Sequence, residues 1–237
     1  MAQTLLCWPV NCCTGDVYVA DTSNHCIRLV SASAVSTVAG SCGVAGWTPD
    51  GPAASSMLSS PYHITMGPGG SAVYWTEAGT CVVRRLHIAA AQVSTVAGTP
   101  RGCGAVADGS ALTARFGAGG PQGLGFFGND LYISDSSNNV IRLLASATGA
   151  VTTYAGQAGS SGASNGPFAS ALFNVPSGIA VDPSGGVYVA DASNSAIRYL
   201  AAGSVTTVAG TPGTDGMVDG LALGAEFDAP SVRVSGT

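Results

Sequence analysis

The stretch SGIAVDPSGGVYVADASNSAIRYLAAGSVTTVAG, residues Ser177 to Gly210, decides the fold. It contains four short runs rich in β-branched and aromatic residues: GIAVD, VYVAD, AIRYL and VTTVAG. The residues between the runs are mainly glycine, serine, proline, asparagine and alanine, and the first four of these favour tight turns. Four such runs in series predict one antiparallel sheet of four strands.

The same unit occurs four times along the chain. The acid that ends its second run lies at positions 21, 77, 135 and 191, in steps of 56, 58 and 56 residues. An arginine follows each acid by seven residues, and each unit closes on a run such as VSTVAG. The arginines are Arg28, Arg84, Arg142 and Arg198, and the closing glycines are Gly40, Gly98, Gly156 and Gly210. A regular period of this length predicts a repeat architecture.

A looser stretch of the form D-G-x-A…F…P follows each unit. These stretches cover residues 50–61, 108–121, 165–176 and 219–230. We expect them to connect one unit to the next.

These residues resemble the NHL repeat, whose pattern runs as a GIAVD strand, then G-N-V-Y-V-A-D-T-x-N-H-x-I-R, T-V-A-G and a D-G-x-A-x-F-x-x-P connection. Residues 21–28, DTSNHCIR, contain the Asn-His pair that gives the family its name. The resemblance covers nearly the whole chain. It implies an all-β fold, a β-propeller of four-stranded antiparallel blades in a single domain. The blades would span 5–40, 62–98, 122–156 and 177–210, with the first strand of a further blade at 231–235.

Both ends of the chain are predicted to begin with the same kind of strand. Leu5 to Val10 would be the innermost strand of the first blade, and Ser231 to Val234 aligns with Ser177 to Ala180. A propeller ring normally closes when its two ends share a blade. Three interpretations therefore stay open: a segment of a longer, six-bladed ring, a compact body of four or five blades, or an arc completed by another copy or another chain.

Composition and charge argue against several classes of partner. The chain has 237 residues, of which 9% are charged, its net charge is -5, and it contains no lysine. The attraction to phosphate that supplies most nucleic-acid affinity is therefore missing, so we expect no nucleic-acid partner. No run approaches about 18 apolar residues, so we expect no membrane insertion.

The seven cysteines lie in the first half of the chain and predict two disulfides. Within a blade, the third and fourth strands are antiparallel neighbours, so the start of one lies beside the end of the other. Two pairs of cysteines occupy these places and lie within reach of disulfide geometry, Cys26 with Cys42 and Cys81 with Cys103. Buried free thiols are the alternative. The remaining three would give one bridge and one free thiol, with Cys7 bonded to Cys12 or Cys13.

Disulfides of this kind indicate an oxidising compartment. We therefore expect a secreted or extracellular protein, or one that faces an oxidising lumen. Residues 1–15 have no basic region before their apolar patch, so no signal peptide is visible. Neither C-x-x-C nor a paired Cys/His spacing occurs, which argues against a structural zinc site. We expect no cofactor.

The acid and arginine pairs recur once in every unit. A residue repeated in this way usually solves a repeated structural problem. The carboxylate can accept turn N–H groups while the guanidinium bridges neighbouring strands or blades. We therefore predict a structural role for all four pairs: Asp21/Arg28, Glu77/Arg84, Asp135/Arg142 and Asp191/Arg198.

The three histidines do not predict a metal site. His63 lies on an inner strand, but its counterparts in the other blades are Gly123, Gly178 and Val232, none of which is a ligand. A single histidine does not make a zinc site. His25 is the turn residue of the family pattern, and we expect His87 to be exposed near a turn.

Function in a propeller more often lies where the repeats differ. Trp47, Arg101 and Arg115, on the connections, are aromatic and arginine anchors of the kind enriched at interfaces, and we predict that they bind a partner. The leading hypothesis is a non-catalytic protein-binding or structural module that presents propeller loops or blade edges to another protein chain or to further copies of itself. The alternative is a propeller hydrolase or lyase with a metal in the channel. That enzyme would need several inward carboxylates or histidines, and the predicted inner strands offer almost none.

Overall fold

The computed structural model describes residues 3–5 and 15–231. Its strands form four antiparallel sheets, which we call blades 1 to 4. Blade 1 contains β1 (Gln3–Leu5), β2 (Val17–Asp21), β3 (Cys26–Val30) and β4 (Val35–Ala39). Blade 2 contains β5 (Gly51–Pro52), β6 (Pro61–Met66), β7 (Ala72–Glu77), β8 (Val82–His87) and β9 (Gln92–Ala97).

Blades 3 and 4 repeat the organisation of blade 2. Blade 3 contains β10 (Gly109–Ser110), β11 (Leu124–Phe127), β12 (Asp130–Asp135), β13 (Val140–Ala145) and β14 (Ala150–Ala155). Blade 4 contains β15 (Gly166–Pro167), β16 (Pro176–Val181), β17 (Val187–Asp191), β18 (Ala196–Ala201) and β19 (Ser204–Ala209). Short 3-10 turns lie between strands: η2 (Thr22–Asn24), η3 (Ala53–Ser55), η4 (Pro68–Gly70), η5 (Ser136–Asn138), η6 (Ala192–Asn194) and η7 (Ala222–Gly224).

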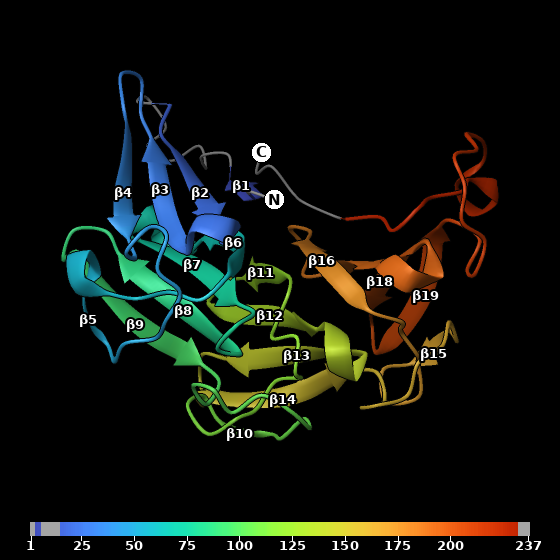
Figure 1. Cartoon of the computed structure of the whole chain (residues 1–237). Coiled ribbons are helices and arrows are strands. Elements are labelled where there is room, and N and C mark those ends of the chain that lie inside the picture. Colours follow the sequence, from blue (N-terminus) through green and yellow to red (C-terminus); the bar gives the residue numbers. More distant parts are fainter. Residues whose placement is uncertain (1–2, 6–14, 232–237) are drawn as a thin grey trace.

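The four blades follow one another in an open arc, with blades 1 and 4 at its two ends (Figure 1). The first strands face the inside of the arc, where β6 contacts β1 and β11, and β11 contacts β16. Three clusters of buried apolar side chains fill the spaces between consecutive blades, which we call spaces 1, 2 and 3. The predicted all-β architecture of propeller blades is confirmed.

The first strand of the chain differs from the prediction. β1 is Gln3–Leu5, with Thr4 opposite Val19, whereas the sequence predicts Leu5 to Val10. The prediction followed the apolar run from Leu5 to Val10, of which the structure describes Leu5 alone. Residues 6–14 lie outside the described residues, and so do Cys7, Cys12 and Cys13. The same holds for residues 232–237 and hence for most of the strand predicted at 231–235.

The first three D-G stretches each add a fifth strand to the following blade. Gly51 pairs with Val93, Gly109 with Val151, and Gly166 with Val205, always on the outer edge. The four main strands of blades 2 to 4 are those that the sequence predicts, and the added strand was not predicted, because a strand of two residues is too short to show a pattern. We number the connections between units 1 to 4; they span residues 41–60, 99–121, 157–175 and 211–230. Connections 1 to 3 each belong structurally to the blade that follows.

The turn after the second strand has the same form in three blades. The acid ends the strand, and the next three residues form a 3-10 turn. A residue with left-handed backbone then precedes the third strand; it is His25, Asn139 or Ser195, with φ of 56°, 57° and 51°. The glycine that closes the unit lies against this turn. At Gly210, φ is +88° and an added Cβ would lie 2.4 Å from the carbonyl oxygen of Ser195, so only glycine fits.

The repeat arginines attach each connection to its blade. Every one of them lies beside a register shift between the third and fourth strands. In blade 4, the buried Arg198 donates to the carbonyl oxygens of Leu172 and Ser164, at 3.0 and 3.1 Å, and to Oδ1 of Asn165 at 2.9 Å. It also donates to Asp191 at 2.7 Å. Three of these acceptors belong to connection 3, so one guanidinium holds the connection, and the pair has the structural role expected for it.

Two disulfides join third strands to the following connections. Cys26 is bonded to Cys42, and Cys81 to Cys103, which are the two pairs that the sequence predicts. Cys26 and Cys81 are buried at the start of their strands. The bridges therefore tie connections 1 and 2 to the blades that they leave, while the arginines tie them to the blades that they join.

We expect Arg198→Met to lower the free energy of unfolding by about 3–5 kcal/mol, because Asp191 would keep a buried carboxylate without its cation. The matched control is Arg28→Met in blade 1. Arg28 lies 3.6 Å from Asp21, and their side chains are 30% and 20% exposed, so its loss should cost less than about 1 kcal/mol. Urea unfolding of the two variants measures the difference, and equal losses would contradict the role of burial.

Replacing Cys81 and Cys103 together by serine should lower the free energy of unfolding by about 3 kcal/mol. The bridge closes a loop with a sequence separation of 22, and removing it gives the unfolded chain more conformational freedom. Urea unfolding with and without a reducing agent checks this, because the double variant should lose less on reduction than the natural chain. Free thiols at both positions in a mass spectrum of the unreduced natural protein would refute the bridge.

Candidate functional site

Connection 4 has the backbone fold of the earlier connections. Gly216 donates its N–H to the carbonyl oxygen of Phe227 at 3.1 Å, as Gly162 does to Phe173 at 3.0 Å in connection 3. Gly210 donates to Ala222 at 2.8 Å, as Gly156 does to Phe168 at 2.9 Å. Its first residues are held by blade 4, where Gly213 donates to the carbonyl oxygen of Asn194 and the Ser195 hydroxyl donates to Asp215. The connection is therefore formed in place.

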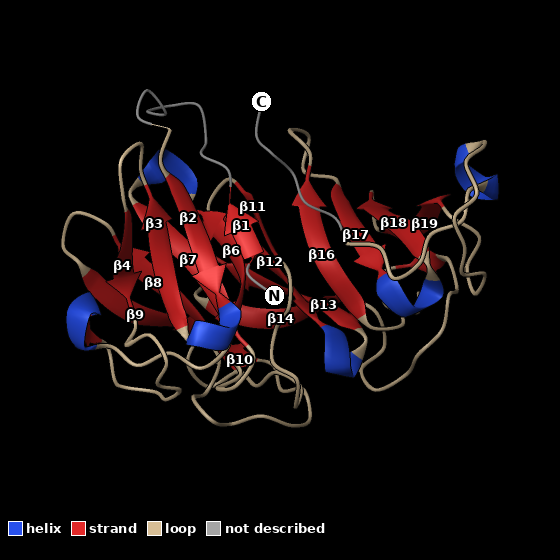
Figure 2. Cartoon of the chain, turned by 45° about the horizontal axis from the view of Figure 1, so that its top comes forward, coloured by secondary structure: helices blue, strands red, loops and turns tan. Residues whose placement is uncertain are grey.

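The side chains of connection 4 are much more exposed than those of its counterparts. Met217, Leu221 and Leu223 are 94%, 89% and 62% exposed. One position near the end of each connection carries a large apolar residue. In connections 1 to 3 this residue is fully buried (Leu58, Phe116 and Phe173), whereas in connection 4 it is Phe227, which is only half-buried. In the earlier connections the following blade covers these positions, and the described residues contain no blade after connection 4. The turned view shows connection 4 and η7 projecting beyond blade 4 (Figure 2).

Blade 1 shows the opposite deficiency. Its outer strand β4 ends the sheet, whereas β9, β14 and β19 each pair with a D-G strand. Its arginine, Arg28, has Asp21 as its ion-pair partner and no connection over it among the described residues. Val35, on β4, is 54% exposed. Blade 1 therefore offers an open outer edge, and connection 4 offers an exposed D-G stretch, Asp219-Gly220.

The predicted partner residues lie on connections 1 and 2. Trp47 is half-buried, at the position that corresponds to Met217 in connection 4. Arg101 and Arg115 are exposed and lie close together, since Nε of Arg115 donates to the carbonyl oxygen of Gly102 at 3.0 Å. The structure thus brings the two arginines together and keeps Trp47 on another connection. Their role in partner binding stays a prediction.

Two residues that depart from the repeat, Trp75 and Glu77, are fully buried in blade 2. Nε1 of Trp75 donates to one carboxylate oxygen of Glu77 at 3.0 Å, and the hydroxyl of Thr80 donates to the other at 2.7 Å. Burial raises the pKa of the Glu77 carboxyl, while Arg84 and these hydrogen bonds oppose the rise. All these partners belong to the fold, so the pair contributes to the packing of blade 2.

The histidines lie apart from one another. Nδ1 of His25 accepts the backbone N–H of Ser60 at 3.1 Å, which supports its predicted role in a turn. His63 is half-buried on β6, and His87 is exposed beside the turn between β8 and β9. Among residues 3–5 and 15–231, no three His, Cys, Asp or Glu side chains gather where they could hold a metal ion. The same residues contain no helix long and apolar enough to cross a membrane.

The sequence pattern did not predict that the apolar residues of connection 4 would be exposed. Their signal is the run GMVDGLALG, 216–224, which carries four large apolar residues where connection 3 has GASNGPFAS, 162–170, with one. The exposure of these side chains depends on whether a neighbouring element packs on connection 4, which a repeat pattern does not reveal.

Comparison with known proteins identifies the repeat. Residues 173–198, which span the turn and arginine of blade 4, match the family model of the NHL repeat. A 70-residue part of the chain is 39% identical to the Arabidopsis thaliana protein SUPPRESSOR OF QUENCHING 1, chloroplastic. That match covers 30% of this chain and 6% of the relative.

Solved structures share the architecture. An auxiliary nutrient binding protein from Bacteroides thetaiotaomicron matches 82% of this chain with a TM-score of 0.62 and 21% identity. Virginiamycin B lyase from Staphylococcus aureus matches 84% with a TM-score of 0.52 and 16% identity. This chain spans 46% and 54% of those two chains, so it corresponds to about half of each. The chain therefore has a β-propeller fold, and its residues 173–198 match the NHL repeat.

Proposed function

We propose that the chain is a non-catalytic interaction module whose partner binds the exposed edges of the arc. The observation that carries this is connection 4, residues 211–230, which is folded like its counterparts but has no blade packed over it among the described residues. Burying its exposed Met217, Leu221 and Leu223 would contribute roughly 1.5–3 kcal/mol for each side chain. We name residues 211–230 the open edge.

The complementary edge is supplied by blade 1 of a further copy. In blade 3, Nη2 of Arg142 lies 2.8 Å from Asp108 of connection 2, and β10 pairs with β14. Asp219 is the counterpart of Asp108, and Arg28 is the counterpart of Arg142. The open edge of one copy would therefore place Asp219 against Arg28 and Gly220 against β4 of the next. This contact is head-to-tail, so it generates a ring or a filament according to its angle.

The charged groups of the repeats support a non-catalytic role. The carboxylates of Asp135 and Asp191 are buried, and each accepts a backbone N–H, at 2.9 and 2.7 Å, as well as contacting its arginine. A catalytic acid or base must reach a substrate proton, and these groups are engaged in the fold. Propeller folds nevertheless carry several activities, since the solved relatives include a binding protein and a lyase.

An oxidising location is part of the proposal. The disulfides Cys26–Cys42 and Cys81–Cys103 support a protein that is secreted or faces an oxidising lumen.

Charge reversal tests the head-to-tail contact. We expect the natural chain to exceed its monomer mass of 23.2 kDa in light scattering at high protein concentration. Asp219→Arg and Arg28→Asp should each weaken association by about tenfold or more, because like charges would meet at the contact. An equal mixture of the two variants should associate again as alternating copies, since each contact regains one aspartate and one arginine.

Asp228→Arg is the matched control, because Asp228 is exposed on the same connection and does not correspond to the paired aspartates. It should associate like the natural chain. Thermal unfolding of each variant separates loss of association from loss of folding. A monomer at all concentrations, or a mixture of folded variants that stays monomeric, would refute the contact.

A further inference from the structure

One position in each of connections 1 to 3 lies inside a space between blades. Its backbone N–H donates to the carbonyl oxygen of a turn in the following blade. Ala53 donates to Ala91 at 2.8 Å, Ala111 to Gly149 at 2.8 Å, and Phe168 to Gly203 at 2.9 Å. Ala53, Ala111 and Phe168 are therefore equivalent residues of spaces 1, 2 and 3.

In space 3 this position carries a ring that completes an aromatic stack. The ring centroids of Phe168 and Tyr154 are 4.7 Å apart, and those of Tyr154 and Tyr132 are 5.0 Å apart. All three pack against the buried apolar cluster between blades 3 and 4. Burial against this stack raises the pKa of Tyr154 to about 12.

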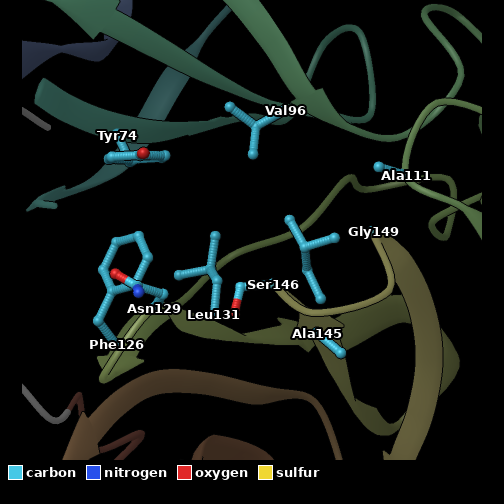
Figure 3. A pocket seen from close by; sticks show the side chains of 10 residues that line it. Tyr74, Val96, Ala111, Phe126, Asn129, Leu131, Ala145, Ser146 and Gly149 are labelled. Atoms are coloured by element: carbon cyan, nitrogen blue, oxygen red, sulfur yellow. The ribbon is translucent and has the colours of Figure 1, made fainter. Parts of the chain in front are cut away.

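In space 2 two of the three rings are replaced by small side chains. Tyr74 corresponds to Tyr132, but Val96 stands in place of Tyr154 and Ala111 in place of Phe168. The result is a pocket of about 260 Å³. Tyr74 and Val96 of blade 2 lie on one side of it, Phe126 and Leu131 of blade 3 on the other, and Ala111 at one end (Figure 3).

Space 1 also has an alanine, Ala53, but it is filled in another way. Met66 and Ile88 of blade 2 pack against the cluster there, and Ala53 is only 2% exposed. By the strand register, the residue that corresponds to Ile88 in blade 3 is Ser146, which is small and exposed. The pocket in space 2 thus results from three small residues at once, at positions 96, 111 and 146.

We propose that this pocket is a binding site for a neutral small molecule with one aromatic ring. The volume is sufficient, since an apolar cavity of about 150 Å³ can take benzene. The lining is mostly apolar and contains no charged side chain, which favours a neutral ligand over an ionic one. Exposed Asn129 and Ser146 lie at the rim, so a hydroxyl on the ring can point to polar groups and solvent.

The walls favour an aromatic ring over another apolar group. Tyr74 and Phe126 already form an edge-to-face pair, with centroids 4.9 Å apart and planes at 73°. A third ring beside them would complete a group of three, as Phe168 does for Tyr154 and Tyr132 in space 3. Edge-to-face contacts between aromatic rings stabilise a complex beyond the free energy gained by burying apolar surface. The pocket lies between blades 2 and 3, so it does not involve the open edge.

The test titrates the full chain with p-cresol and records the methyl resonances of Val96, Leu131 and Leu144 by NMR. We expect saturable shifts of these methyl groups. Ala111→Phe should place a phenyl ring in the pocket, as Phe168 does in space 3, and should weaken p-cresol binding by about tenfold or more. It should also raise the melting temperature, which shows that the variant is folded.

Two controls make the outcome specific. Ala89→Phe adds the same ring at an exposed turn of blade 2 outside the pocket, and it should leave p-cresol binding unchanged. The saturated analogue 4-methylcyclohexanol has nearly the same size and should bind several-fold more weakly. The proposal is overturned if p-cresol shifts none of the three methyl groups, if folded Ala111→Phe binds it as the natural chain does, or if the saturated analogue binds equally well.

Discussion

The buried guanidinium of the repeat arginine is the interaction on which the arrangement of blades depends. A cation in an apolar interior needs acceptors close to its charged group, because desolvation is otherwise too costly. Arg198 finds a carboxylate in its own blade and carbonyl oxygens in the connection that precedes it. The chain can satisfy this arginine only if that connection crosses to the following blade. The arginine of each blade thereby fixes the path of the connection that arrives from the preceding blade. The same interaction, repeated from blade to blade, sets the arrangement of the arc.

Much of this arrangement could be predicted from the sequence, because it repeats. The period of the acid, the arginine and the closing glycine indicated four blades, and the antiparallel order of strands placed Cys26 beside Cys42 and Cys81 beside Cys103. The first strand could not be placed, because the apolar run from Leu5 to Val10 looked more strand-like than Gln3–Leu5. The fifth strands were missed because two residues show no alternation. Exposure of Met217 and the pocket at Ala111 depend on which neighbour is present, and a repeat pattern does not contain that information.

Differences between equivalent residues carry the functional content of this chain. Phe168 and Ala111 have the same backbone hydrogen bonds, so the exchange of a ring for a methyl group changes the space and leaves the fold unaltered. Trp47 and Met217 likewise share a place in their connections, but one is half-buried by blade 2 and the other is 94% exposed. A repeat architecture lets such exchanges occur one blade at a time, since each blade contacts mainly its neighbours.

The positions of the disulfides bear on how the arc would come apart. They lie in blades 1 and 2, where the shortest distance from the repeat arginine to a carboxylate is 3.6 Å (to Asp21) and 3.9 Å (to Asp50). In blades 3 and 4 the shortest distance is 2.8 Å (to Asp108) and 2.7 Å (to Asp191), the other ion pair of blade 3 is 3.5 Å long, and there is no bridge among the described residues. The cross-links therefore lie in the two blades whose arginines have no carboxylate within 3.5 Å. In a linear array of units, the least stable unit frays first and exposes the next. Cross-links at the weak end raise its local opening energy toward that of the other end, so the oxidised arc can unfold as one cooperative body, and a reducing environment would let it unravel from blade 1.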